Sequence, residues 1–452
     1  MKRLPRVDLL ADAPELAPAR ELLGRRAVVG LVREVLAEQR EIVRAGGAAI
    51  GAEEALKLVA GRAEQRRASR LRAVINATGV VLHTNLGRAP LPPESASRLT
   101  ELAWRYTSVE LDLELGTRSR RAASIEAALA EISGAESALL VVNNAAAVLL
   151  ALSTLAAGRE VVVSRGELVE IGGGFRIPEV LVRSGARLRE VGTTNRTRVG
   201  DYAAAIDAAT ACVLRVHPSN FRISGFTERP SLRELCELSH ERGVPLVKDL
   251  GGGLVSELPG IEGEPSVQSC LAAGADLVCF SLDKLFGGPQ GGVIVGKREL
   301  VSRLRDDPLA RALRVDKLIL LALEPVIEAY QRGQSERIPV HAMLRARPEA
   351  LEERIRGWQR ALGELAARTT LIETTAAAGG GTLPEEPLGS RALSIRTEDA
   401  EGLSRALRRG DPAVLPRIAD GAVLLDARTV LPGEDEALIA ALRAALSLEN
   451  QN

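Results

Sequence analysis

Two patterns of apolar residues divide the chain. From Gly24 to Ala45 apolar residues recur at helical spacing, a Gly-Gly pair ends that helix, and a second helix runs from Ala52 to about Leu71. From Val74 onward, short β-rich runs alternate with helical stretches. The runs are ALLVV (138–142), EVVVS (160–164), ACVLRV (211–216), PLVKDL (245–250) and DLVCFS (276–281). This alternation predicts a mainly parallel sheet with helices on both faces, whose ligands bind at the carboxyl ends of the strands.

The pattern changes again in the last third of the sequence. After about Glu324 a long helical stretch leads to Thr370, and the Gly-rich turn AAAGGGTLP follows. A strand-helix-strand-helix unit comes next, in the segments ALSIRT, AEGLSRALRR, GAVLLDART and EDEALIAALRAAL. We therefore predict three domains: a helical domain over 1–72, a large α/β domain over 73–324 and a small α/β domain over 325–452.

Charge changes this picture only in the first domain. The 59 Lys and Arg residues balance the 59 Asp and Glu residues, so the chain as a whole has no net field to attract DNA or an anionic membrane. Residues 1–72 hold 15 basic against 10 acidic residues, a net charge of +5. This excess is typical either of a solvated helical face or of a module that binds a polyanion or mediates assembly.

Cysteine usage and the absence of long apolar runs indicate the compartment. The four cysteines form no CxxC pair, which is typical of reduced thiols: Cys212, Cys236, Cys270 and Cys279. The first residues carry acids and prolines where a secretory signal needs an apolar stretch, and no run reaches the ~18 apolar residues of a membrane span. We therefore expect a cytoplasmic protein that does not enter a membrane.

The strongest local signal for chemistry is DLVCFSLDKLFGGPQGGVIVG. An apolar strand delivers Ser281, Asp283 and Lys284 into a Gly-rich turn that leads to another apolar strand. A lysine at the end of a buried strand loses hydration, which lowers the pKa of its amine and frees it for Schiff-base chemistry. The alternative is a lysine that reaches solvent from the strand end.

Two further strand ends favour the Schiff-base interpretation. LVKDLGGG ends a strand at Asp249, where a carboxylate keeps a pyridine nitrogen protonated, although such an Asp is also a common cap or turn former. VVNNAAAVLLAL leads from a strand into a helix of small residues, so the N–H groups near Asn144, Ala145 and Ala146 suit a phosphate, or form a plain helix cap. Phosphate cradle, then Asp249, then Lys284, on successive strand ends, predicts a pyridoxal 5'-phosphate site.

Other polar residues extend this candidate site. Ser281, on the strand before the lysine, and His217, directly after the strand ACVLRV, are candidate cofactor contacts, although His217 is equally typical of a buried core histidine. Arg88 lies in the turn NLGRAPLP, and Arg311 and Arg314 are three residues apart on one helix turn. Guanidinium groups match phosphate oxygens in a bidentate way, so these arginines are either an oxyanion site or ordinary surface cations.

As a set, the motifs resemble one family, the bacterial selenocysteine synthases, or L-seryl-tRNA(Sec) selenium transferases. The matching stretches cover nearly the full chain: VINATGVVLHTNLGRAPL, SRGELVEIGGGFRIPEV, EVGTTNRTRVGDY, VHPSNFRISGFT, FSLDKLFGGPQGG, ALRVDKL, GGGTLP and LLDART. One departure is KDLGGG, where members of the family more often show a serine among the glycines.

The resemblance implies a fold, an activity and partners. The fold is the aminotransferase-like fold type I of pyridoxal-phosphate enzymes, with Lys284 as the Schiff-base lysine and Asp249 at the pyridine nitrogen. Seryl-tRNA(Sec) becomes selenocysteinyl-tRNA(Sec) through a dehydroalanyl-tRNA intermediate, with selenophosphate as the selenium donor. Arg88, Arg311 and Arg314 are then expected to bind the donor's oxyanion. The basic N-terminal domain is expected to bind tRNA, and the chain to assemble with itself as a homodecamer of dimers.

Two alternatives stay open from the sequence. A pyridoxal-phosphate lyase could eliminate across Cα and Cβ of a small free amino acid or amino-sugar acid, but it needs no basic helical domain before residue 72. A tRNA-binding protein without catalysis is disfavoured because Lys284 and Asp249 are both present.

Overall fold

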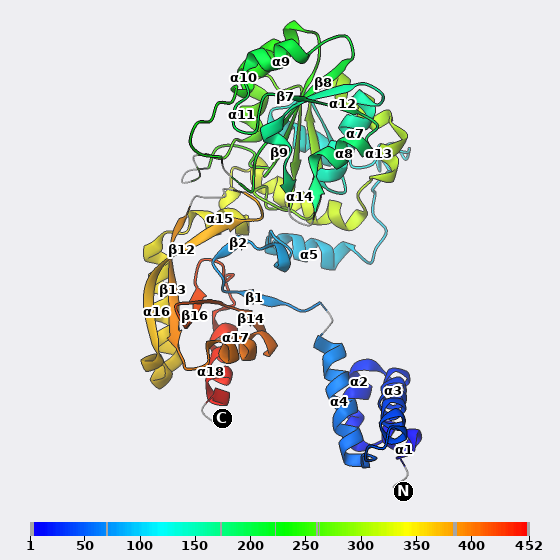
Figure 1. Ribbon diagram of the computed structural model, residues 1–452, viewed down its shortest axis with the longest axis vertical. Helices are drawn as coiled ribbons and strands as arrows, with labels where there is room; N and C mark the ends of the chain where they lie inside the picture. The colour runs from blue at the N-terminus through cyan, green and yellow to red at the C-terminus, as the bar shows by residue number, and fades with distance from the viewer. Residues whose placement is uncertain are drawn as a thin grey trace. The chain divides into compact units, whose positions relative to one another are not determined.

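The computed structural model describes residues 4–68, 71–171, 174–221, 223–258, 261, 263–382 and 387–449. It divides into two compact units. The first comprises Met1–Ile75 with Arg405–Val414, and the second comprises Asn76–Ser404 with Leu415–Asn452. Both units are drawn in Figure 1.

The first unit is a helical bundle with its own small core. Its helices are α1 (Val7–Ala11), η1 (Pro14–Leu16), α2 (Ala17–Leu23), α3 (Arg25–Arg44) and α4 (Ala52–Ala68). The apolar positions Val28, Leu31, Val32, Val35 and Leu36 recur every three to four residues along α3, and all are buried. They pack against buried residues of the other helices, so the amphipathic stripe builds this core. Both helices predicted in this region are confirmed. β1 (Val74–Asn76) follows them and pairs with β14 (Ala413–Leu415).

A seven-stranded sheet forms the centre of the second unit. Its strand order is β3-β11-β10-β9-β8-β4-β7. The strands are β3 (Ser137–Val141), β4 (Glu160–Ser164), β7 (Arg187–Val191), β8 (Thr210–Val216), β9 (Leu246–Gly251), β10 (Leu277–Ser281) and β11 (Gly292–Gly296). The neighbours from β10 to β7 are parallel, whereas β11 is antiparallel to both β10 and β3. All five apolar runs predicted as strands are confirmed. The edge strand β7 matched none of these runs, because charged residues alternate along it.

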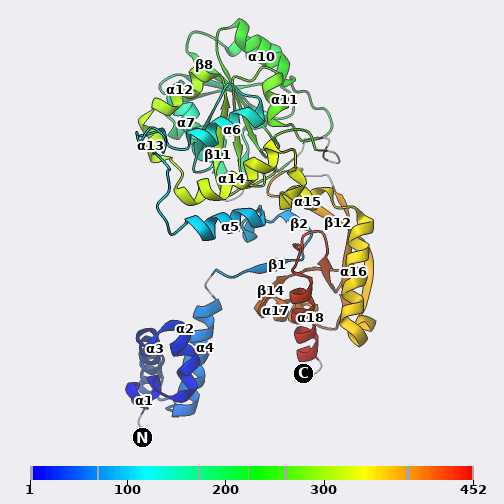
Figure 2. The same cartoon turned by 180° about the vertical axis from the view of Figure 1, so that it is seen from behind.

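Helices cover both faces of this sheet (Figures 1 and 2). One face packs on α6 (Ala123–Ser133), α9 (Val199–Ala205), α10 (Leu232–Glu241), α11 (Val267–Ala272) and α14 (Lys317–Gln331). The other packs on α7 (Asn144–Ala156), α8 (Ile177–Arg183), α12 (Arg298–Asp306) and α13 (Pro308–Ala312). Successive strand residues alternate between the faces: Leu246 and Leu250 of β9 lie in the first core and Val247 in the second. Lys248 and Asp249 therefore project to opposite faces.

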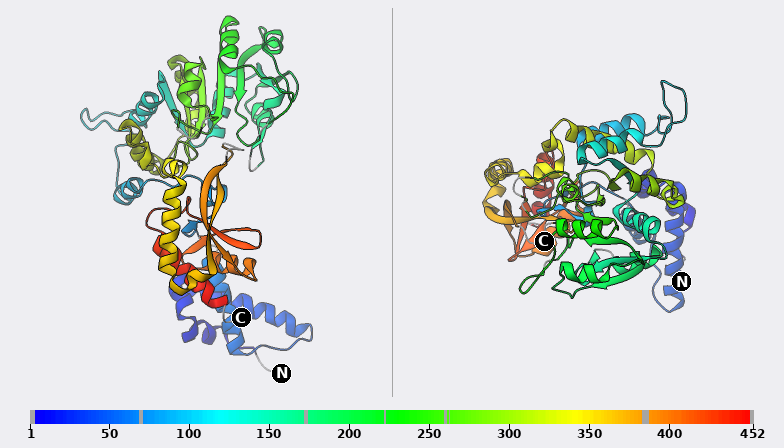
Figure 3. Two further views of the ribbon diagram at one scale, coloured as in Figure 1. Left: turned by 90° about the vertical axis from the view of Figure 1, so that its left-hand side faces the viewer. Right: turned by 90° about the horizontal axis from the view of Figure 1, so that it is seen from above.

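A second sheet and its helices form the small α/β part of this unit. Its strand order is β15-β16-β13-β12-β2. The strands are β2 (Val80–Leu82), β12 (Thr369–Gly379), β13 (Leu388–Arg396), β15 (Arg417–Ala419) and β16 (Ala422–Asp426). Helix α16 (Pro348–Leu362), yellow in Figure 3, runs along the orange strands β12 and β13. Further helices are α15 (Pro339–Arg345), α17 (Ala400–Arg409) and α18 (Asp435–Glu449), of which α17 belongs partly to each unit, whereas α5 (Pro93–Leu102) packs on α14.

The sequence pattern did not predict strand β12. Its segment TTLIETTAAAG ends in three alanines and a glycine, which carry no strand signal of their own. It becomes a strand by pairing with β13 on one side and with β2, nearly 300 residues earlier in the chain, on the other.

Among the described residues, no helix is long and apolar enough to span a bilayer.

Candidate active site

Lys284 lies in the turn that follows β10. The turn is fixed by backbone hydrogen bonds from Gly287 N to Lys284 O (2.9 Å) and from Gly288 N to Leu282 O (2.8 Å). The flanking Leu285 and Phe286 are fully buried and anchor it in the core. Lys284 itself is only 6% exposed. Burial, together with the nearby Arg88 cation, lowers the pKa of its amine, which favours the neutral, nucleophilic form.

Asp249 lies on the neighbouring strand, β9, and is 3% exposed. Its Oδ1 accepts a 2.9 Å hydrogen bond from Nδ2 of Asn144, the first residue of α7. Burial raises the pKa of this carboxyl group, while the hydrogen bond from Asn144 and the cations Lys248 and Lys284 oppose the rise. Asn144 Oδ1 is buried and, within the described part of the chain, has no hydrogen-bond partner. The carboxylate is thus held in one orientation at the carboxyl end of the sheet.

The start of α7 combines a helix cap with free donors. Asn143 is the cap, and its Oδ1 accepts from Ala146 N at 2.8 Å. Among the described residues, no hydrogen bond engages the N–H of Asn144 or Ala145. Gly292 of β11 packs directly on the Asn143–Asn144 peptide, where a Cβ would overlap the Asn143 carbonyl. The two interpretations of this segment, cap and anion cradle, therefore apply to different N–H groups of one turn.

Arg88 reaches the lysine turn from a distant part of the sequence. Its Nη1 donates a 2.8 Å hydrogen bond to Asp283 Oδ2, and Ser281 Oγ donates to Asp283 Oδ1 at 2.8 Å. Arg88 has a φ of 65°, a left-handed conformation that is unfavourable for a side chain other than glycine. The predicted residues Arg88, Ser281 and Lys284 are thus brought together, and Asp283 joins them.

His217 lies beside Asp249, and an unpredicted carboxylate, Glu264, lies beside His217. His217 N donates to Asp249 O at 2.9 Å, and His217 Nε2 lies 3.2 Å from Glu264 Oε2. Glu264 belongs to the loop before α11, and nothing in its local sequence distinguishes it from a surface glutamate. Only the packing of that loop on β9 brings it to the site.

The structure places Arg311 and Arg314 in a second cavity, of about 260 Å³, whose lining does not include Lys284 or Arg88. This cavity also contains three further arginines: Arg120, Arg121 and Arg305. Arg314 Nη1 lies 3.8 Å from Glu110 Oε1. Leu313 O accepts from Val142 N at 3.0 Å, so this segment is attached to the end of β3, just before the α7 cap.

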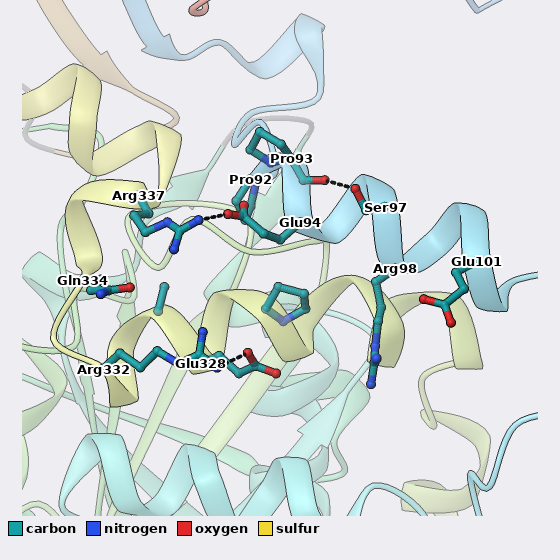
Figure 4. Close-up of a pocket in the computed structure, with 12 residues that line it drawn as sticks. Pro92, Pro93, Glu94, Ser97, Arg98, Glu101, Glu328, Arg332, Gln334 and Arg337 are labelled. Atoms are coloured by element: carbon teal, nitrogen blue, oxygen red, sulfur yellow. Dashed lines mark hydrogen bonds and ion pairs between the residues drawn. The ribbon is translucent and has the colours of Figure 1, made fainter.

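A further cleft, of about 400 Å³, lies between α5 and α14 (Figure 4). Its charged side chains pair with one another, as in Arg332 with Glu328 at 2.9 Å and Arg337 with Glu94. We assign no chemistry to this cleft because its cations and anions already neutralise each other.

Comparisons with known proteins identify what this arrangement is similar to. Residues 74–431 match the family described as L-seryl-tRNA selenium transferase, and residues 1–40 match the family described as selenocysteine synthase N terminal. The L-seryl-tRNA(Sec) selenium transferase of Moorella thermoacetica is 50% identical over 99% of this chain and 97% of its own length. The enzyme of the same name from Aquifex aeolicus is 45% identical over 84% of this chain and 85% of its own length.

A comparison with solved structures shows a similar fold. The D-glucosaminate-6-phosphate ammonia-lyase structure superposes with a TM-score of 0.59 at 21% identity, covering 84% of this chain and 97% of that one. This likeness concerns the fold alone. Together with the sheet topology, it confirms the predicted aminotransferase-like α/β class with a smaller α/β part and N-terminal helices.

Proposed function

The chain belongs to the L-seryl-tRNA selenium transferase family, and we propose that it converts L-seryl-tRNA(Sec) to L-selenocysteinyl-tRNA(Sec) with selenophosphate as the selenium donor. The observation that carries this proposal is the buried Lys284 amine in the turn after β10, beside the strand β9 that carries the buried Asp249 carboxylate, inside the region that matches the family. An elimination followed by an addition at Cβ of serine needs a base and an electron sink together. Lys284 offers the base, and Asp249 is placed to keep protonated the cofactor ring that would supply the sink.

The residues present fit pyridoxal 5'-phosphate as the cofactor. Lys284 offers an amine with a lowered pKa, Asp249 offers a fixed carboxylate, and the start of α7 offers the free N–H groups of Asn144 and Ala145 to a phosphate. When bound, this cofactor supplies an electron sink for a carbanion at the substrate's Cα. His217 and Ser281 lie at the same strand ends and complete the proposed cofactor contacts. Ala146, in the first turn of α7, is also assigned to the phosphate site.

Each protein group then has a defined task. Lys284 would hold the cofactor and would take the substrate's Cα proton at Nζ. Asp249 would keep a proton at the pyridine nitrogen, and Asn144 keeps that carboxylate in position. Arg88 presents a guanidinium group beside Lys284, where it can bind the donor's oxyanion while Asp283 orients it.

Arg311 and Arg314 have a related proposed task. They line a cavity with three other arginines, but Glu126, Asp306 and Asp307 line it as well, and Arg305 pairs with Glu126 at 3.2 Å. Because this lining does not include Arg88, we propose Arg88 for the donor site beside Lys284, and Arg311 and Arg314 as a second contact of the donor's oxyanion, as the family resemblance predicts.

The partners and assembly follow from the same proposal. The helical domain over 1–72, with its net charge of +5, is assigned to tRNA binding, the region 73–324 to catalysis and 325–452 to the small α/β domain. We also propose that the chain forms a homodecamer of dimers in the cytoplasm, where charged tRNA is available.

The test is a reaction with purified, cofactor-loaded protein, seryl-tRNA(Sec) and selenophosphate. We expect selenocysteinyl-tRNA(Sec) from the wild type and none from Lys284→Ala, which loses the base and the attachment point. Free L-serine and D-glucosaminate 6-phosphate serve as competing substrates in parallel reactions. Turnover of either small molecule, without turnover of seryl-tRNA(Sec), would establish the lyase alternative instead.

A further inference from the structure

Glu264 is a buried carboxylate of which only one oxygen has a polar partner among the described residues. Its side chain is 2% exposed, and Oε2 lies 3.2 Å from His217 Nε2. Oε1 is buried and has no hydrogen-bond partner among the described residues. A buried carboxylate oxygen without a donor costs free energy, so its presence calls for a physical explanation.

Gly252 makes room for this carboxylate. A Cβ added to Gly252 would overlap Glu264 Oε1 and would stand 3.3 Å from Leu285 Cδ1. Gly252 O accepts a 2.9 Å hydrogen bond from Leu285 N, the residue after the site lysine. A Cβ added to the preceding residue, Gly251, would stand 3.9 Å from Lys284 Nζ. Glu264 Oε1 and Lys284 Nζ therefore lie against consecutive residues of one strand end.

The charges around Lys284 show why this position matters. Four charged groups act on its amine: Arg88, Asp249, Asp283 and Glu264. Asp283 is already paired with Arg88 at 2.8 Å, and Asp249 is turned toward Asn144. Burial and Arg88 lower the pKa of the lysine amine, whereas Asp249, Asp283 and, least strongly, Glu264 raise it.

We propose that Glu264 is a positioning residue of the active site, which holds the His217 ring through Nε2 and places a negative charge beside Lys284. This inference rests on the proposed attachment of the cofactor at Lys284. With the cofactor attached, a negative charge there would favour the proton on Lys284 Nζ. Glu264 acts through Lys284 and His217 and does not itself exchange a proton with the substrate.

The test is a pH titration of the visible absorption of the cofactor-loaded full-length protein. Glu264→Gln keeps the shape and removes the charge, so the pH at which the Lys284 nitrogen loses its proton should fall by about one unit. Gly252→Ser should shift it in the same direction, because the added side chain displaces the Glu264 carboxylate. Two matched controls should titrate like the wild type: Glu179→Gln, at an exposed carboxylate, and Gly200→Ser, where a Cβ meets nothing within 4 Å.

Borohydride reduction and peptide mapping accompany every titration and separate the two possible failures. Label at a lysine other than Lys284 would remove the proposed function's premise and this inference with it. Label at Lys284, with both Glu264→Gln and Gly252→Ser titrating like the wild type, would overturn the role of Glu264 alone. If Glu264→Gln does not fold, Gly252→Ser decides the question by itself.

Discussion

The charged residues of the helical unit and those of the seven-stranded sheet are of the same types but occupy opposite environments. In the helical unit, Arg25 and Asp12 form a 2.8 Å pair while staying 62% and 53% exposed. At the sheet, Asp249 and Lys284 are almost fully buried and their pKa values move away from the usual ones. Water screens the exposed charges of the helical unit, so they act on a partner mainly through their net charge. The buried charges at the sheet are screened much less, so each one changes the pKa of its own neighbours.

Adjacent residues of β9 make a finer version of this comparison. Asp249 projects toward α7 and Asn144, whereas Lys248 projects to the other face, toward Glu167, Arg215 and Cys270. Burial lowers the pKa of Lys248 to about 8. Both residues are buried, but only Asp249 belongs to the group around Lys284. Burial alone therefore does not identify a functional charge. The groups around the charge distinguish a residue of the site from one outside it.

The largest effect is expected from Asp249→Asn. The amide cannot keep the pyridine nitrogen protonated, so we expect cofactor binding to persist while kcat falls by at least about 100-fold. Binding is measured by absorption and turnover by formation of selenocysteinyl-tRNA(Sec). Unchanged turnover would reduce Asp249 to a structural role.

Deletion of residues 1–72 tests the net positive charge of the helical domain. Because phosphate contacts dominate affinity for nucleic acid, we expect the truncated protein to bind tRNA(Sec) about 10- to 100-fold more weakly and with a flatter salt dependence. Its absorption should still show cofactor at Lys284. Filter binding at several salt concentrations measures the effect, and an unchanged affinity and slope would contradict the assignment of this domain.

Lys248→Met tests the buried charge outside the site. The folded-state pKa of Lys248, about 8, lies below the ordinary 10.5, so the unfolded chain binds more protons between these values. The free energy of unfolding therefore rises with pH across that window in the wild type, and the charged lysine destabilises the fold below it. We expect Lys248→Met to raise the free energy of unfolding at pH 7 by about 1–3 kcal/mol and to remove this part of the pH dependence.

Denaturant unfolding of Lys248→Met and wild type at pH 7 and pH 10 measures that difference. Cofactor attachment should be unaffected. A destabilised variant at pH 7 would mean that Lys248 has a charge partner strong enough to offset its burial.

The smallest effect is expected from Arg25→Ala. The ion pair with Asp12 is exposed on both sides, so its loss should leave Tm within about 1 °C of the wild type. Differential scanning calorimetry measures this. A larger drop would show that surface pairs in the helical unit act as a network.

The sequence predicted those residues of the site that lie at or just after the ends of strands. Lys284, Asp249 and Asn144 each follow an apolar run, and parallel strands bring such ends to one edge, so their proximity followed from the pattern. Asp283 was noted beside the lysine, but its pairing with Arg88 depends on a contact across 195 residues. Glu264 had no local signal because a loop carries it.

The same limit applies to the fold. The buried central strands were predictable because each is a short apolar run that alternates with a helical stretch, whereas β12 forms through pairing with β2 and β13. The placement of Arg311 and Arg314 in their own cavity likewise depends on how α13 packs beside β3.

The antiparallel strand β11 has a consequence for biosynthesis on the ribosome. In the described part of the chain, β3 joins the sheet only through β11, although β11 is made some 150 residues later. Until β11 emerges and inserts, the nascent β3 has no strand to pair with, and the α7 cap after it cannot be fixed beside Asp249 and Lys284. We therefore expect the newborn chain to acquire its cofactor only after Gly296 has left the exit tunnel.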